Sequence, residues 1–329
     1  MSTIWFAGPS SLHFPKGKPL PFVLLGEKYA IFQNTSGYHA LSDVCPHRQA
    51  SLSLGTVKGE CLTCPYHGWQ FAGNGEVKTV PAHPLQKIGS KFKADVAAIS
   101  SSCGWTFIRP LESAQNLSSE ASLELSEGAK QFFATPPGTF RSISGTFDWS
   151  ANFSRVVANG IDFAHLPFVH ADSFGNVDYE EVEKYQCIDF DGGASSRQIM
   201  VPPDNFQQKL FRLVVNRGKK NTVLGTVSFL IPNMTRLDLE LGFGARMILI
   251  ASHVPVSEKE TRTYWVMHRN FAKLALLDAM FFKETLKIFA ADQTIVESQT
   301  AMNSTDGQQI TVASDALEML YRKKMRQLG

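Results

Sequence analysis

The stretch that decides the fold lies between residues 45 and 69, where Cys45-Pro46-His47-Arg48 is followed by Cys64-Pro65-Tyr66-His67-Gly68-Trp69. Each of the two segments offers one thiolate and one imidazole within a tight loop, and sixteen residues separate His47 from Cys64. The proline after each cysteine and the glycine after His67 favour rigid loops that hold ligands near the surface. Two matched pairs at this spacing predict one metal site built from both loops.

The donor set narrows the kind of metal site. Two sulfur and two nitrogen ligands suit a [2Fe-2S] cluster whose cysteines bind one iron and whose histidines bind the other. Zinc accepts the same donors, but its motifs space paired ligands more widely than Cys45-x-His47 does. A redox motif from Cys61 to Cys64 leaves Cys45 and both histidines unexplained. Scattered core cysteines and hydrogen-bonded histidines are the remaining alternative, and the mirrored spacing argues against it.

A second constellation runs from Asn159 through Asp162 and His165 to His170. Two histidines five residues apart on a continuous helix point about 140° away from each other, at about 100° per residue. Pro167 interrupts the helix expected over residues 148–166, so the chain can turn after His165 and bring His170 back. Asp162 lies three residues before His165, on the same face of that helix. Two histidines and one carboxylate, with open positions beside them, form the facial triad of non-haem iron oxygenases.

The third ligand is expected on the long helical pattern that begins at residue 272 and ends near residue 302. Asp292 falls on an apolar stripe of that helix, where a carboxylate is costly unless it is paired or bound to metal. Asp278 lies near the same face and is the competing candidate, whereas Glu297 falls on the far side. The expected stripe consists of Leu274, Leu277, Phe281, Ile288 and Ile295.

The predicted secondary structure changes along the chain. Short strand-like runs with turns predict an all-β module over residues 1–112, and a polar stretch predicts a linker over residues 113–138. Residues 139–329 combine β-rich runs with the long helical pattern and a short helix over residues 315–327. An antiparallel sheet packed on a long C-terminal helix makes the whole chain α+β.

Composition excludes several classes of protein. The chain has 329 residues, 43% of them hydrophobic, and a formal net charge of +2, which argues against nucleic acid as the main partner. Five cysteines do not make a disulfide framework in a chain of this length. No apolar run is long enough for a membrane span, and residues 1–10 lack the pattern of a signal peptide. We therefore expect a cytoplasmic protein.

Taken together, the motifs resemble those of Rieske non-haem iron oxygenases. The two Cys-Pro segments resemble the Rieske domain, with Gln49 standing where that family usually has glycine. Asn159, Asp162, His165 and His170 match the Asn/Asp-x-x-Asp-x-x-His-x-x-x-x-His pattern of the same family. The segment over residues 292–299 resembles the family's C-terminal segment, which carries the carboxylate ligand.

The resemblance implies a β-sandwich Rieske domain followed by a helix-grip catalytic domain. It assigns the [2Fe-2S] cluster to Cys45, His47, Cys64 and His67, and the mononuclear Fe(II) to His165, His170 and Asp292. It also implies that Asp162 bridges to a cluster histidine of a neighbouring subunit in a head-to-tail homotrimer, and that Asn159 lies beside the iron.

The implied reaction is hydroxylation or oxidative demethylation of a small organic substrate with O2, with a reductase or ferredoxin as the electron donor. The short chain and compact catalytic domain resemble the monooxygenase and O- or N-demethylase branch. Two alternatives stay open, a cis-dihydroxylating dioxygenase and a Rieske electron carrier without mononuclear iron. Arg155, Arg246 and His253 are possible polar contacts for the substrate.

Overall fold

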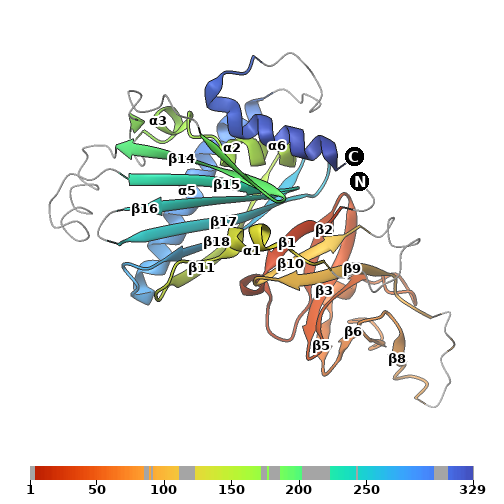
Figure 1. Ribbon diagram of the computed structural model, residues 1–329. Helices are drawn as coiled ribbons and strands as arrows, with labels where there is room; N and C mark the ends of the chain where they lie inside the picture. Colours follow the sequence, from red (N-terminus) through yellow and green to blue (C-terminus); the bar gives the residue numbers. More distant parts are fainter. Residues whose placement is uncertain are drawn as a thin grey trace. The chain divides into compact units, whose positions relative to one another are not determined.

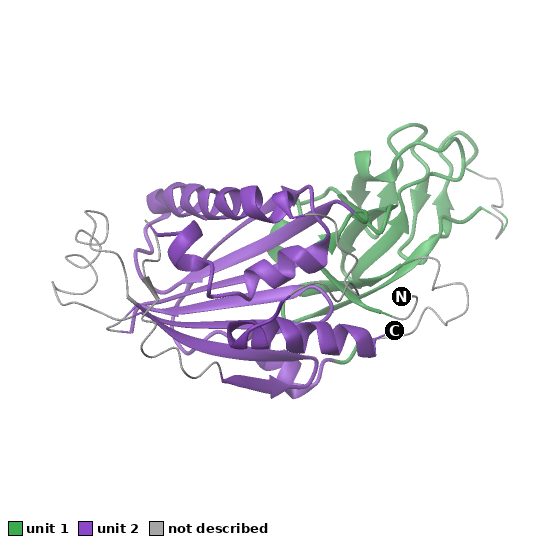
Figure 2. Cartoon of the chain, turned by 90° about the horizontal axis from the view of Figure 1, so that it is seen from above, with its two compact units in different colours: residues 1–124, 254–258 green, residues 125–253, 259–329 purple. Residues whose placement is uncertain are grey.

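The computed structural model of the protein describes residues 4–84, 89, 92–110, 123–171, 176–177, 186–201, 223–241, 244–299 and 310–328. The chain divides into two compact units, which Figure 2 draws in green and purple. Unit 1 consists of residues 1–124 and 254–258, and unit 2 of residues 125–253 and 259–329. Residues 111–122, which include the first part of the expected linker, lie outside the described residues.

Unit 1 is built from strands, as expected (Figure 1). One sheet has six strands in the order β1-β10-β9-β4-β3-β2, and another has four in the order β5-β6-β7-β8. The strands are β1 (Phe6–Ser10), β2 (Leu20–Leu24), β3 (Glu27–Asn34), β4 (Gly37–Ser42), β5 (Thr56–Lys58), β6 (Cys61–Thr63), β7 (Gln70–Phe71), β8 (Val77–Thr79), β9 (Val96–Ser102) and β10 (Trp105–Arg109), with single 3-10 turns η1 (Ser11–His13) and η2 (Leu52–Leu54). Cys45 and Cys64 belong to the buried core of this unit, together with Phe32, Leu62 and Phe71.

Unit 2 combines one large antiparallel sheet with helices (Figure 1). The eight-stranded sheet has the order β11-β18-β17-β16-β15-β14-β12, and β13 pairs with β14. Its strands are β11 (Arg141–Trp149), β12 (Asn176–Val177), β13 (Cys187–Phe190), β14 (Gly193–Val201), β15 (Val223–Leu230), β16 (Met234–Glu240), β17 (Arg246–Pro255) and β18 (Thr261–Arg269). The helices are α1 (Glu127–Phe133), α2 (Phe153–Gly160), α3 (Leu166–Val169), α5 (Asp278–Ser298) and α6 (Ala316–Gln327), with 3-10 turns η4 (Ala275–Leu277) and η5 (Ala313–Asp315).

Three helices of unit 2 pack on its large sheet. Helix α5 packs along β11, α2 packs on β16 and α6 packs along β14. Close approach of α5 requires a glycine in β11, because a Cβ at Gly145 would lie 2.5 Å from Trp265 and 2.7 Å from Phe282. Trp149, Trp265 and Phe289 then fill the core between α5 and the sheet. The α+β fold class expected from the sequence is confirmed.

The helix expected over residues 148–166 is wrong at both ends. Trp149 still belongs to β11, because it pairs with Thr261 of β18. Helix α2 begins after Asn152, whose side chain accepts a hydrogen bond from the N–H of Ser154, and it ends at Gly160. The long C-terminal helix is shorter than expected, since α5 covers Asp278–Ser298. Among the described helices, none combines the length and hydrophobicity needed to cross a membrane.

Candidate active site

The two Cys-Pro loops of unit 1 have the same backbone design. In the first loop the N–H of Cys45 donates to the carbonyl of Ala50, and the N–H of Gln49 donates back to the carbonyl of Cys45. In the second loop Cys64 donates to Trp69 and Gly68 donates back to Cys64, at the same sequence offsets. The mirrored sequence spacing therefore corresponds to a mirrored pair of turns, one after β4 and one after β6.

Gln49 and Gly68 occupy the same place in their loops, and both have a left-handed backbone, with φ of 57° and 72°. That conformation strains a residue with a Cβ atom but not glycine. The departure from the family pattern at Gln49 is therefore a change of side chain without a change of backbone shape. The loop retains the conformation that glycine favours, at a cost in strain.

The side chains of these loops separate sulfur from nitrogen. Cys45 and Cys64 are buried and their thiols hydrogen-bond to each other, while His47 and His67 are exposed with ring centres 4.6 Å apart. Burial raises the pKa of the Cys45 thiol, and the neighbouring Cys64 raises it further. The backbone N–H groups of His47 and Arg48 point at the Cys45 sulfur, as suits a thiolate bound to iron. This donor set fits a [2Fe-2S] cluster with inner cysteines and outer histidines.

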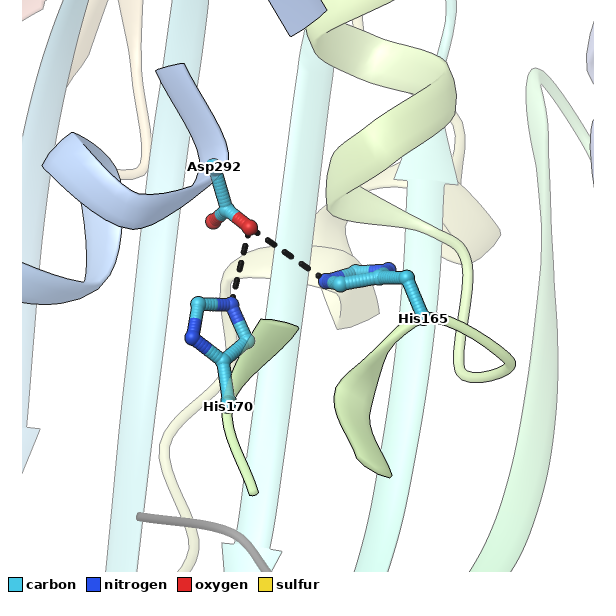
Figure 3. Close-up of side chains that lie close together, drawn as sticks. All are labelled: His165, His170 and Asp292. Carbon is cyan, nitrogen blue, oxygen red and sulfur yellow. Dashed lines mark hydrogen bonds and ion pairs between the residues drawn. The ribbon is translucent and has the colours of Figure 1, made fainter. Parts of the chain in front are cut away.

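Unit 2 brings His165, His170 and Asp292 together (Figure 3). Their ligand atoms all lie within 4.8 Å of one another, and among the described residues they form the only such group of His, Cys, Asp or Glu. Asp292 Oδ1 lies 2.8 Å from Nε2 of His170 and 3.4 Å from Nε2 of His165. Asp292 comes from α5, His165 from the turn before α3, and His170 from the end of α3.

The geometry passes a simple test for a metal. Donor atoms about 2.1 Å from a first-row metal and at right angles to each other lie about 3.0 Å apart, close to the two distances from Asp292. Burial raises the pKa of Asp292, but hydrogen bonds from His165 and His170 outweigh burial and hold that pKa below its usual value. Burial lowers the pKa of His165, while Asp162 and Asp292 together raise it to about 9. The site thus brings an ionised carboxylate and two histidine rings together, a donor set that would hold a divalent cation.

Asp162 reaches His165 by a turn and not along a helix. Its Oδ1 accepts a hydrogen bond from the N–H of Ala164 at 2.7 Å, which makes a short Asx turn after α2 ends. Its Oδ2 lies 3.2 Å from Nδ1 of His165, the ring nitrogen that faces away from Asp292. Pro167 then falls within the first turn of α3, where proline is tolerated, and α3 carries the chain to His170.

The competing carboxylates of α5 have other partners. Asp278 accepts hydrogen bonds from Arg141 Nε at 2.7 Å and from the buried Arg269, and these two cations hold its pKa below the usual value. Glu297 accepts from the backbone N–H of Ser150 at 2.6 Å. Of the three acidic candidates, Asp292 alone joins the histidine pair.

The prediction of which residues form the buried stripe of α5 is wrong by about one residue. Leu274 and Ile295 are exposed, at 65% and 45%, and the buried line of the helix consists of Thr285, Phe289, Asp292 and Val296. Asp292 is buried on either stripe. The error arose because α5 also presents apolar side chains outside its buried line.

The ligand group opens onto a cavity of about 90 Å³ in unit 2. Asn159 and Asp162 line it beside the histidines, and most of its wall is apolar, from Val156, Leu237, Leu249, Met267 and Phe289. A second cavity, of about 340 Å³, also includes Asn159, Asp162 and His165, together with residues of the α6 region. Asp162 and His165 therefore lie between the two cavities.

The polar residues of the first cavity were only partly expected from the sequence. His253 lines the cavity, whereas Arg155 lines the second cavity and Arg246 pairs with Glu240 at 3.5 Å. Thr235 and Thr285 also line the cavity and were missed. A single threonine in a strand or helix carries no spacing signal, so only the fold could reveal them.

Known families match both units. Residues 4–89 match the Rieske [2Fe-2S] domain, and residues 149–329, more than half of the chain, match the vanillate O-demethylase oxygenase C-terminal domain. The chain belongs to the Rieske oxygenases. This confirms the resemblance found in the sequence, and with it the two kinds of cofactor, a [2Fe-2S] cluster and a mononuclear iron.

Relatives of this Rieske oxygenase cover nearly its whole length. Methylxanthine N1-demethylase NdmA from Pseudomonas putida is 28% identical over 330 residues, which is 98% of this chain and 84% of that protein. The vanillate O-demethylase oxygenase subunit from Pseudomonas sp. (strain HR199 / DSM 7063) is 25% identical over 304 residues, 86% of this chain and 81% of that protein. The protein is thus an oxidoreductase of the monooxygenase and demethylase type.

Solved structures show the same fold. NdmA with caffeine superposes with a TM-score of 0.71 at 25% identity, covering 98% of this chain and 90% of that one. Dicamba monooxygenase bound to 3,6-dichlorosalicylic acid superposes with a TM-score of 0.77 at 18% identity, covering 99% and 97%.

Proposed function

We propose that this Rieske oxygenase removes a methyl group from a small organic substrate, with His165, His170 and Asp292 holding the mononuclear iron and Cys45, His47, Cys64 and His67 holding the cluster. The observation that carries the proposal is the convergence of His165, His170 and Asp292 on one largely apolar cavity. When bound, the iron supplies the O2 chemistry and the cluster supplies single electrons. Hydroxylation of the methyl carbon then releases it as formaldehyde.

The protein's own residues have distinct roles in this proposal. The apolar wall of the cavity binds the methyl-bearing part of the substrate and excludes water. Asp162 holds His165 by its Nδ1 atom, which fixes the orientation of the ring and raises its basicity. Asn159 lines the same cavity from the last turn of α2 and contacts the ligand group or the substrate there.

Asp162 is also the proposed entry point for electrons. Its side chain is 35% exposed and faces the second cavity as well as the first. A cluster histidine from a neighbouring subunit could reach it there, so we propose a head-to-tail homotrimer supplied by a reductase or ferredoxin. None of the five cysteines forms a disulfide, which supports a reducing, cytoplasmic location.

Product analysis tests the proposed reaction. The reconstituted protein, with a surrogate reductase, NADH and O2, is given a panel of O- and N-methylated aromatic compounds, and formaldehyde and the demethylated product are quantified. We expect equal amounts of the two products, dependent on O2. A cis-diol without formaldehyde would replace demethylation by ring dihydroxylation, and no product from the whole panel with both metal centres present would contradict the proposal.

A further inference from the structure

A chain of four hydrogen-bonded side chains runs from the core of unit 2 to the wall of the substrate cavity. Trp149 Nε1 lies 2.8 Å from Thr263 Oγ1, and Thr263 Oγ1 lies 2.8 Å from Nδ1 of His253. Nε2 of His253 lies 2.8 Å from Thr235 Oγ1. Thr263 is fully buried, while His253 and Thr235 line the cavity.

The first member of this chain fixes the direction of every hydrogen bond in it. An indole N–H can only donate, so Thr263 Oγ1 accepts from Trp149. Among the described residues, the only other partner of the Thr263 hydroxyl is Nδ1 of His253. A fully buried hydroxyl donates rather than leave its hydrogen unpaired, so Nδ1 of His253 accepts.

The hydrogen bond at Nδ1 also fixes which nitrogen of the His253 ring donates. Burial lowers the pKa of His253 to about 3, so the ring is neutral near pH 7 and carries one N–H. With Nδ1 accepting, that hydrogen sits on Nε2 and is donated to Thr235 Oγ1. The hydroxyl hydrogen of Thr235 is then left over, and no acceptor for it lies among the described residues.

Thr235 is held where this hydrogen can meet a substrate. It lies on β16 against α2, since a Cβ added at Gly160 would lie 3.2 Å from Thr235 Cγ2 and 3.3 Å from Thr235 Oγ1. Gly160 follows Asn159 directly, and both line the cavity onto which the iron ligands open. Beside the carboxamide of Asn159, the cavity thus presents the Thr235 hydroxyl as a donor whose direction is fixed, on an otherwise largely apolar wall.

The charges around the cavity restrict the acceptor. Among its described lining residues there is no lysine or arginine, and Asp162 and Asp292 are acidic. A carboxylate buried here would have no lysine or arginine to pair with and would lie in the same cavity as two acidic side chains, which is unfavourable. A carbonyl oxygen on a neutral molecule accepts a hydrogen bond without that penalty.

We propose that Thr235 is a specificity-determining residue that donates a hydrogen bond to a carbonyl-type oxygen of a neutral, methyl-bearing substrate, with Trp149, Thr263 and His253 fixing the direction of that bond. This inference rests on the proposed function, because it takes the cavity beside the ligand group as the substrate site. It adds the chemical class of the substrate.

Binding of matched probes tests the inference. The holoenzyme is kept under nitrogen, so that no turnover occurs, and equilibrium dialysis measures the Kd of 4-methoxyacetophenone, 4-isopropenylanisole and 4-methoxybenzoate. The first two differ only by a carbonyl oxygen against a methylene group, and the third carries a charge. We expect the ketone to bind about tenfold to about a hundredfold more tightly than the methylene analogue, and more tightly than the carboxylate.

Variants then assign that preference to one hydroxyl. Thr235→Val should abolish the preference for the ketone with little effect on the methylene analogue, and Thr235→Ser should restore it. Thr285→Val is the matched control, because Thr285 lines the same cavity but its hydroxyl already donates to the carbonyl of Phe281 at 2.8 Å.

Several results would overturn the assignment: no preference in the wild type, a preference that survives Thr235→Val, tighter binding of the carboxylate, or no binding of any probe. Because these are equilibrium measurements, their outcome is separate from that of the turnover experiment. A protein that prefers the ketone through Thr235 but forms no product would keep this inference and lose the proposed reaction.

Discussion

The buried His253 predicts a specific loss of stability on mild acidification. Burial lowers its pKa to about 3 in the folded protein, whereas an unfolded histidine titrates near about 6.5. The unfolded state therefore binds a proton that the folded state excludes, and stability is lost as the pH falls from about 6.5 toward about 3. Each pH unit in that window destabilises the fold by about 1.4 kcal/mol, so going from pH 7 to pH 5 costs about 2 kcal/mol.

This magnitude depends little on the value in the folded state, because any folded pKa of about 4 or less gives nearly the same loss at pH 5. For a unit of this size, about 2 kcal/mol corresponds to a fall in melting temperature of roughly 4–8 °C. The assay is calorimetry of the wild type and of His253→Gln at both pH values. Gln keeps a donor toward Thr235 and does not titrate, and the other ionisable groups cancel in the comparison.

We expect the wild type to lose roughly 4–8 °C more than His253→Gln between pH 7 and pH 5. If both proteins lose the same amount, His253 is not a buried neutral ring, and the directional argument for Thr235 fails with it.

Three further outcomes follow from the site and its supporting loops. Asp292→Asn should lose the mononuclear iron and keep the cluster's colour, as measured by metal analysis. Asp278→Asn should keep the iron and melt at a lower temperature in calorimetry, because the buried Arg269 loses its counter-charge. The reverse pattern would mean that the wrong carboxylate was chosen. Asp162→Asn should retain both metal centres but form product at least about tenfold more slowly from a pre-reduced cluster. An unchanged single-turnover rate would show that Asp162 only stabilises the Asx turn that it forms with Ala164. Gln49→Gly should stabilise unit 1 by about 1 kcal/mol, measured by calorimetry, because the left-handed backbone at this position, with φ of 57°, strains a residue that has a Cβ atom. A neutral or destabilising effect would show that the Gln49 side chain compensates for the strain.

The sequence predicted the parts of the site that depend on local spacing. The offsets within the two Cys-Pro segments predicted paired loops, and the structure has two turns with the same hydrogen bonds. The position of Pro167 indicated that the chain turns between His165 and His170, and these two residues do converge on Asp292. The roles of all these residues as ligands stay predictions until metal is measured.

What the sequence could not supply depends on contacts between distant segments. The residues around Trp149 predict a helix, but pairing with β18 makes Trp149 part of a strand. The three-residue spacing predicts that Asp162 and His165 share a helix face, but an Asx turn places Asp162 instead. The path from Trp149 to Thr235 joins four strands of one sheet, and no periodicity along the chain marks it. Asp278 could be set aside only once its pairing with Arg141 was visible.

The count of iron and acid-labile sulfide per chain, after anaerobic purification of iron-replete protein, tests the central claim most directly. A [2Fe-2S] cluster and a separate mononuclear site predict about three irons and about two sulfides. About two irons with about two sulfides would mean that His165, His170 and Asp292 hold no iron, and that the protein carries electrons without activating O2.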